Sequence, residues 1–401
     1  MPPSLRHRIG YDGAMRIVRP LCRLLCLVVG CLIVEHAVLH AQSGQQLALD
    51  LAAAVAQYRR ALDAYNTAHD AYAAAASAYW NAVAQKRQLR NAKRARDEPL
   101  AVDDYVLTQP PVYTGPPKPR NPIKPEVPPR PVYVPVVADF LAAAQTEFKF
   151  LPRLPQSEDE FKRAYAKVAL AAGLARDQIL RIYGFEATGN GSYDVEAGLE
   201  FNKNARAITT ALGYNQLLAT NSVEILAEDG NRFVAQLRER AAQLPDGRVL
   251  ESKIDVLRRM IAFARSVPDS WGQHEILANT AKGLGVHALN LDVDVGPLLQ
   301  TQKLLDSVVF ARRKGWAGPL SAAELEMMNL TGDGNGFDMV TMPVSWRDKV
   351  PTANFFQASG YADNPVAQRN NVVAKLITAT DAQMDQEVKK PGAQELAALL
   401  H

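Results

Sequence analysis

A concentration of proline between residues 99 and 135 constrains this chain more than any other feature of its sequence. The 401 residues include 25 prolines, and twelve of these lie in that stretch. Because proline has no backbone N–H and a fixed φ, the stretch cannot join a helix or the interior of a sheet. We expect residues 99–136 to form an extended linker that reaches on the order of 100 Å. A domain boundary near residue 136 follows.

The segment before the prolines, residues 43–96, is rich in Ala, Gln and Arg, which favour helix. Apolar and aromatic residues recur there in alternating steps of four and three, the period of a left-handed coiled-coil seam. The members of this stripe are Leu51, Val55, Tyr58, Leu62, Tyr65, His69, Tyr72, Ala76, Tyr79 and Val83. We expect residues 42–98 to form one Ala-rich heptad helix. Residues 45–96 either self-associate as a coiled coil or fold back on the rest of the chain.

The first 41 residues have the form of a secretory signal peptide. Three arginines precede LLCLVVGCLIV, an apolar core that is too short to span a bilayer as a helix. Cleavage after Ala41 would export the protein to the periplasm or the medium and leave no stable membrane span. Processing as a lipoprotein at Cys31 is a second interpretation, and an uncleaved anchor is a third. All the cysteines, Cys22, Cys26 and Cys31, lie in this segment, so the mature protein would have no disulfide or thiolate chemistry.

Several function classes are not supported by charge or by motif. The net charge is +3, which gives no basis for binding nucleic acid. The sequence has no phosphate-binding loop, no nucleophile-elbow motif and no recognised zinc spacing, so we expect no cofactor and no metal. The TGDGNGFD segment at 331–338 lacks the full ligand set of a calcium loop and is interpreted as a glycine-rich turn.

Residues 137–401 have apolar side chains spaced by three and four almost throughout, with Gly and Pro at the breaks. Alternation typical of strands is scarce, so the chain is predicted to be mainly α. The predicted helical runs include residues 176–186, 205–228 and 321–330.

Three short sequence stretches follow one another along residues 176–332. Residues 176–186 end on Glu186, just before the small residues ATGNG; Gly213-Tyr214-Asn215-Gln216-Leu217 follows; and Met327-Met328-Asn329 precedes a glycine turn. Together they resemble the motifs of soluble lytic transglycosylases, relatives of goose-type lysozyme, over about residues 165–335. The resemblance implies a lysozyme-like helical fold for residues 137–401.

The same resemblance implies an activity on peptidoglycan glycan strands. One catalytic glutamate, Glu186, would cleave the MurNAc–GlcNAc bond without water and form 1,6-anhydroMurNAc. Gly213 and Gln216 would lie at the floor of the cleft, Gln216 and Asn329 would hold substrate polar groups, and Tyr193 and Tyr214 would stack on sugar rings.

The apolar residues around Glu186 point to the same chemistry independently. Leu180, Ile182 and Phe185 would disfavour its charged form and keep it available as an acid. Asp194 or Glu196 could supply a second carboxylate that activates water, as most glycosidases require. The alternative for these two residues is to cap the next helix.

Three positions depart from the family pattern. Met328 stands where the family has tyrosine, Ala187 replaces a serine, and residues 231–288 are longer than the corresponding family segment. A second interpretation follows from Met328: a catalytically degenerate envelope protein that binds glycan or a partner protein.

Overall fold

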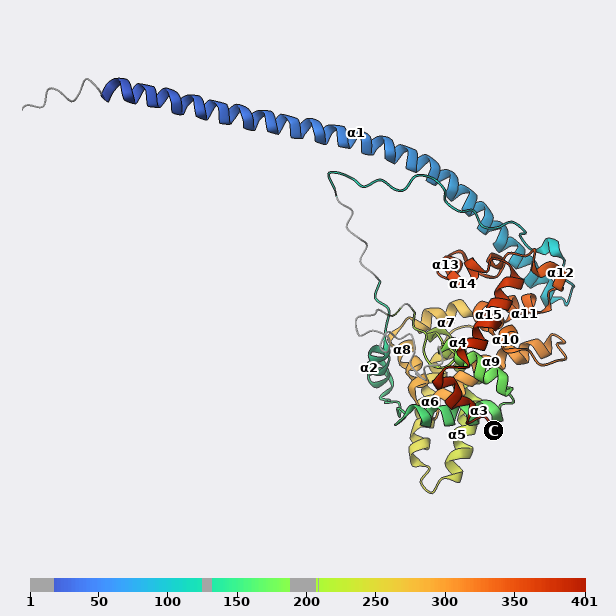
Figure 1. The fold of residues 1–401 in the computed structure, drawn as a ribbon. Helices are drawn as coiled ribbons and strands as arrows, with labels where there is room; N and C mark the ends of the chain where they lie inside the picture. The colour runs from blue at the N-terminus through green and yellow to red at the C-terminus, as the bar shows by residue number, and fades with distance from the viewer. Residues whose placement is uncertain (1–17, 125–131, 188–206, 208) are drawn as a thin grey trace, which may run out of the picture. The chain divides into compact units, whose positions relative to one another are not determined.

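The structure is a computed structural model, which describes residues 18–124, 132–187, 207 and 209–401, with side chains described from residue 45. Within these ranges the regular secondary structure is helical, with two isolated β-bridges (Figure 1). The mainly α fold that the sequence predicts is therefore confirmed.

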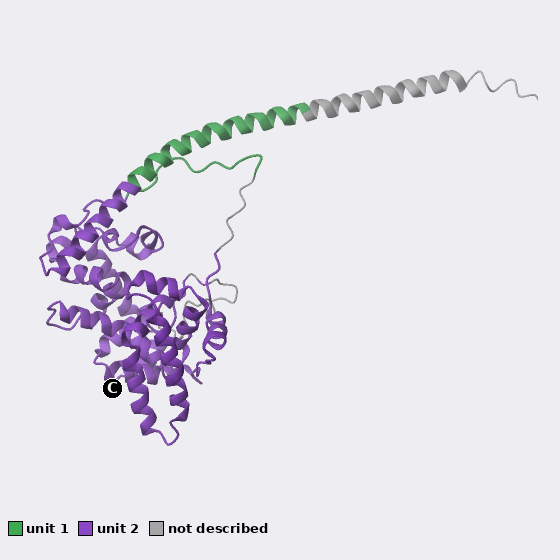
Figure 2. Cartoon of the chain, turned by 180° about the vertical axis from the view of Figure 1, so that it is seen from behind, with its two compact units in different colours: residues 1–76, 111–130 green, residues 77–110, 131–401 purple. Residues whose placement is uncertain are grey.

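The chain divides into two compact units (Figure 2). Unit 1 comprises residues 1–76 and 111–130, and unit 2 comprises residues 77–110 and 131–401. This division differs from the boundary expected near residue 136. The beginning of the proline-rich stretch belongs with the C-terminal body, whereas its middle belongs with the N-terminal helix.

Unit 1 is built on α1 (Val18–Ala95), whose last turns belong to unit 2. The helix expected over residues 42–98 is present. Tyr113, from the proline-rich segment, lies edge-on to three rings of the heptad stripe, with centroids 6.1 Å from Tyr65, 6.0 Å from His69 and 5.5 Å from Tyr72. Around residue 113 the segment is thus packed on the stripe rather than held away from it as a free spacer.

A glycine makes this packing possible. A Cβ atom on Gly115 would lie only 2.8 Å from the Ala68 methyl carbon, so a larger residue would push the segment off the helix.

The apolar core of the predicted signal peptide falls within α1, and residues 1–17 lie outside the described part of the chain. In the part that is described, no helix combines the length and apolar character needed to cross a membrane.

In unit 2 the end of α1 is fixed by buried contacts. Tyr79 and Val83, the last members of the heptad stripe, are buried in a cluster with Tyr105 and Phe355. Arg90 is fully buried; it pairs with Asp338 and donates to the carbonyls of Asp104 and Asn354. Of the two alternatives for residues 45–96, folding back on the chain therefore holds for their C-terminal end.

Eighteen further helical segments of unit 2 follow α1 in the described part of the chain. They are η1 (Val102–Asp104), α2 (Val137–Phe148), α3 (Glu158–Ala171), α4 (Arg176–Glu186), α5 (Ala219–Gln243), α6 (Arg248–Ala264), α7 (Trp271–Ala278), α8 (Ala281–His287), η2 (Ala288–Leu291), α9 (Gly296–Arg313), α10 (Ala322–Thr331), α11 (Asp333–Thr341), α12 (Val344–Arg347), η3 (Thr352–Phe355), α13 (Ala358–Ala362), α14 (Pro365–Arg369), α15 (Val373–Glu387) and α16 (Pro391–Ala397).

The helix predicted over residues 205–228 is wrong in its first half. Helix α5 begins at Ala219, and a tight turn closed by the Leu212–Leu217 bridge precedes it. Gly213 has φ +86° in this turn, a conformation that favours glycine. Gln300 of α9 secures the turn, because its Oε1 accepts from the backbone N–H of Asn215 at 2.8 Å and its Nε2 donates to the carbonyl of Leu212 at 3.0 Å. These tertiary hydrogen bonds override the local helical preference.

Two apolar clusters form most of the core of unit 2. One lies among α2, α5, α6 and α8, and includes Phe140, Leu226 and Leu257. The other gathers side chains of α3, α4, α9, α10 and α16 around Tyr183 and Met328. Because α4 and α10 share this second cluster, the C-terminal end of α4 lies beside α10.

Candidate functional site

Glu186 lies at the C-terminal end of α4, in a half-buried position. Ile179, Ile182 and Tyr183 are fully buried and fix the helix against the core. At its start the side chain of Gln178 accepts from the backbone N–H of Ala175 at 2.9 Å. Glu186 is the last residue of α4 and follows Ile182 by four residues and Tyr183 by three, so its carboxyl group lies at the C-terminal end of the helix face that carries these buried side chains.

Helix α10 brings a polar side chain to the same point. Ser321 and Glu324 form a reciprocal capping box that starts this helix. Met328 is buried in the core, whereas Asn329, the next residue, turns its amide toward α4. The Asn329 Nδ2 atom lies 2.8 Å from Oε1 of Glu186, which is a hydrogen bond of ordinary length. The first and third sequence motifs therefore meet.

A second carboxyl group completes this cluster. Glu326 lies one turn before Asn329 on α10 and is 1% exposed. Its Oε2 atom is 3.4 Å from Nδ2 of Asn329, so the two glutamates share one amide. Burial raises the pKa of Glu326 well above its usual range, and the adjacent Glu186 carboxylate raises that pKa further. Glu186, Glu326 and Asn329 are hereafter the carboxyl–amide cluster.

None of the sequence motifs includes Glu326 as a site residue. A signal was present, because Glu326 and Asn329 are three positions apart in ELEMMN and so share one face of a helix. Nothing in the sequence showed that this face turns toward the interior.

Further acids share one cation with Glu326. Lys303 of α9 lowers the pKa values of Glu326, of Glu224 on α5 and of Asp333 on α11 through its positive charge. Burial nevertheless raises the pKa of Glu224 to about 7. Asp333 also accepts a hydrogen bond of 2.6 Å from the Ser307 hydroxyl. The neighbourhood thus holds several carboxyl groups whose burial favours the protonated form.

Among the described residues, one group of acids has the spacing of a metal site: Glu228, Asp229 and Asp306, with ligand oxygens within 4.8 Å of one another. Asp229 is paired with Arg232 at 3.1 Å, and burial raises the pKa of Asp306 to about 7. This group supplies no part of the carboxyl–amide cluster.

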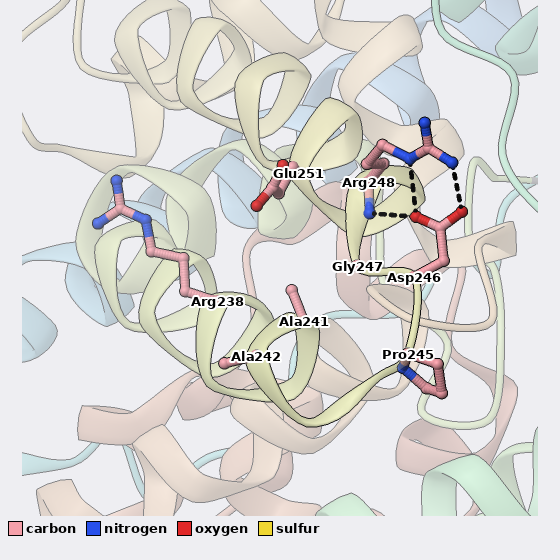
Figure 3. A pocket seen from close by; sticks show the side chains of 8 residues that line it. All are labelled: Arg238, Ala241, Ala242, Pro245, Asp246, Gly247, Arg248 and Glu251. Atoms are coloured by element: carbon pink, nitrogen blue, oxygen red, sulfur yellow. Dashed lines mark hydrogen bonds and ion pairs between the residues drawn. The ribbon is translucent and has the colours of Figure 1, made fainter.

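A surface hollow lies at the turn between α5 and α6 (Figure 3). It lies between Arg238 and Glu251, and Arg248 clamps Asp246 across the turn with hydrogen bonds of 3.0 Å. This pairing shapes the turn, and the hollow presents no polar group that is held ready for chemistry.

The remaining predicted site residues have different positions. Gly213 and Gln216 lie in the turn before α5, and Nε2 of Gln216 donates to the Gly213 carbonyl at 2.7 Å. Tyr193, Asp194 and Glu196 lie outside the described residues.

Tyr214 requires a correction. It is 0% exposed and meets the rings of Phe161, Tyr165 and Tyr183 edge-on, at 5.0, 5.3 and 4.5 Å. Its hydroxyl donates to the Glu158 carboxylate. No face of the Tyr214 ring is open to a sugar, so its role is to pack the core and not to stack on substrate.

Comparisons with protein-family models, with curated proteins and with solved structures found no match.

Proposed function

We propose that this protein cleaves peptidoglycan glycan strands as a lytic transglycosylase, with Glu186 as its single catalytic acid and base. The observation that carries the proposal is the hydrogen bond from Asn329 to Glu186, which joins the first and third motifs at one point. The motif order alone does not require such a contact, because the two residues are 143 positions apart. A lysozyme-like arrangement of unit 2 forms part of the proposal.

The proposed reaction needs one proton to leave Glu186 and one to return. Protonated Glu186 gives its proton to the glycosidic oxygen while the bond from that oxygen to the MurNAc anomeric carbon breaks. The substrate's N-acetyl oxygen attacks that carbon from the opposite face. The 6-hydroxyl of MurNAc then displaces the N-acetyl oxygen and passes its proton to Glu186, which closes the 1,6-anhydro ring and restores the acid.

The surroundings of Glu186 support an acid role. A half-buried carboxyl group beside a second, fully buried carboxyl group cannot easily carry charge at the same time as its neighbour. The pair therefore holds its last proton to higher pH than an exposed glutamate does, and Glu186 acts as the acid while both carboxyl groups are protonated. Asn329 can orient Glu186, and it is also available to a substrate hydroxyl or acetamido group.

The location follows from the substrate. We propose that residues 1–41 act as a signal peptide and that the mature protein works in the periplasm or outside the cell, with lipidation at Cys31 as the alternative. Self-association is proposed only through the part of the heptad stripe that lies in unit 1, because Tyr79 and Val83 are buried within unit 2.

A specific observation favours a second candidate function. Met328 is 0% exposed and packs in the core, so the position of the family tyrosine offers no hydroxyl to Glu186. A protein that binds glycan, or a partner, without cleaving it would tolerate this residue.

The test uses purified mature protein, peptidoglycan and mass spectrometry of the products. The wild type should release 1,6-anhydromuropeptides, and Glu186→Gln should reduce the rate about 100- to 10,000-fold because glutamine cannot donate the proton. Glu275→Gln changes an exposed glutamate of α7 and should behave as the wild type does. Products with reducing ends would indicate attack by water. Binding without products, in the wild type and in Glu186→Gln alike, would favour the non-catalytic candidate.

A further inference from the structure

Glu326 has hydrogen-bonding capacity that the mechanism above does not use. Among the described residues its Oε1 atom is buried without a hydrogen-bond donor, and its Oε2 atom has only the long contact of 3.4 Å with Asn329. Glu186 is the carboxyl group beside it, because its Oε1 atom lies 2.8 Å from the same Nδ2 atom of Asn329. Two carboxylates have only acceptor oxygens, so a hydrogen bond between these carboxyl groups requires a proton on one of them.

The proton belongs on Glu326. Glu326 is fully buried and Glu186 is half-buried, so ionising Glu326 costs more solvation free energy. Among the charged groups around Glu326, Glu186 of α4 favours its neutral form, and Lys303 of α9 opposes it less strongly. The α15 acids Asp381 and Asp385 are paired with Arg181 at 2.8 Å instead.

We infer that Glu326 is a positioning residue that, in its neutral form, donates its O–H to Glu186 and holds that carboxyl group in one orientation. The catalytic part of this inference rests on the proposed function, whereas the carboxyl pair itself does not. Glu186 is then held by two donors, the Glu326 hydroxyl and the Asn329 amide.

This arrangement has a consequence for each step of the reaction. When Glu186 gives up its proton, both donors stabilise the carboxylate that forms. Because the last proton of the pair stays on Glu326, Glu186 is the first of the two to ionise as the pH rises. Cleavage should therefore fall with the loss of the proton on Glu186, while Glu326 is still neutral and still donates to it.

The pair can be tested without any measurement of glycan cleavage. Infrared difference spectra of the full mature protein, recorded as a function of pH, should show a protonated carboxyl group that persists at pH 7. Glu224 and Asp306 have pKa values of about 7 and also contribute at this pH, so the signal of Glu326 is the component that Glu326→Gln removes. Glu186→Gln should leave the signal but shift its titration to lower pH, because the charge that raises the pKa of Glu326 is gone. A protonated-carboxyl signal at pH 7 that is the same in Glu326→Gln as in the wild type would overturn the inference.

The positioning role needs a second measurement, the rate of anhydro-product release. Glu326→Gln retains a neutral donor and should keep most of the wild-type kcat. Glu326→Leu removes the donor and should lower kcat about ten- to hundred-fold, with little change in KM. Its pH profile should also move to higher pH, since charged Glu186 is less stabilised. Equal rates for Glu326→Leu and the wild type would refute positioning. A wild type that shows the infrared signal but no cleavage would refute the proposed function alone.

Discussion

The side-chain amide of Asn329 donates a 2.8 Å hydrogen bond to the carboxylate of Glu186, across 143 residues of sequence. The contact exists because α4 and α10 share one apolar cluster, which includes Ile182 and Met328. Packing of apolar side chains on both helices thus sets the distance between two polar side chains that themselves add little to the core.

We expect Asn329→Ala to lower the rate of glycan cleavage about ten-fold or more, because Glu186 loses a donor that orients it. The effect should be on kcat rather than on the stability of the fold, since Asn329 is only half-buried. The matched control is Asn335→Ala on α11, whose amide donates to the Thr331 carbonyl at 3.2 Å. Equal loss of activity in both variants would show that the contact with Glu186 is not the cause.

The buried histidine His287 should make stability depend on pH. Burial lowers its pKa from 6.5 to about 4. Its ring contacts the Ser222 hydroxyl at 2.8 Å and the Thr210 carbonyl at 2.7 Å. In the unfolded chain His287 is protonated below pH 6.5, whereas in the fold it stays neutral down to about pH 4.

Stability should therefore fall as the pH drops from 6.5 toward 4, by at most about 3 kcal/mol from this group. The measurement is denaturant unfolding of the wild type and of His287→Gln at several pH values. The variant should be less stable at pH 7, but the gap should narrow in acid. Parallel curves would contradict the assignment.

Glu224 should change the pH dependence of stability in the opposite direction to His287. Burial raises its pKa to about 7, so the native state holds a proton that the unfolded chain has already released above pH 4.5. The stabilisation that this proton provides is lost as the pH rises from 4.5 to about 7. Glu224→Gln removes the cost of ionisation and should gain on the order of 1–2 kcal/mol relative to the wild type at pH 8, and less at pH 5. Thermal unfolding at the two pH values tests this, with Glu275→Gln as the exposed control.

Much of the helical structure could be predicted from the spacing of apolar residues. Helix α4 begins and ends where the sequence pattern does, because its apolar positions repeat at helical spacing and its last residue is polar. The turn at 211–217 could not be predicted in this way. Its backbone is bound by Gln300, and no local pattern indicates which distant side chain will satisfy a backbone group.

The candidate site was predictable only in part, for a similar reason. Glu186 and Asn329 were identified from short motifs, and the structure places them in contact. Tyr214 was expected to face a ligand but faces three aromatic rings, since a tyrosine suits either environment. Glu326 was missed because a helical glutamate is usually exposed, and its burial depends on how α10 packs.

The buried pair of Arg90 and Asp338 should be essential to the packing of the α1 end within unit 2. Arg90 is fully buried, donates to Asp338 at 3.3 Å and lies over the Tyr105 ring at 4.6 Å. Arg90→Met leaves Asp338 with one cation fewer in a dry site and should cost about 3–5 kcal/mol in unfolding free energy. The control is Arg96→Met, which breaks an exposed pair with Glu98 and should change stability little. Similar losses in both variants would mean that burial of the pair is unimportant.

The packing of Tyr113 on α1 predicts how the proline-rich segment responds to protease. Because its ring meets Tyr65, His69 and Tyr72, Tyr113 holds residues 111–124 against the helix. Tyr113→Ala removes these contacts and should make cleavage within the segment several-fold faster, since protease requires an accessible, extended backbone. Val112 is 78% exposed, so Val112→Ala is the matched control and should be cleaved at the wild-type rate. A full-length protein with Tyr113→Ala that resists cleavage as the wild type does would show that prolines alone, and not the tyrosine contacts, protect the segment.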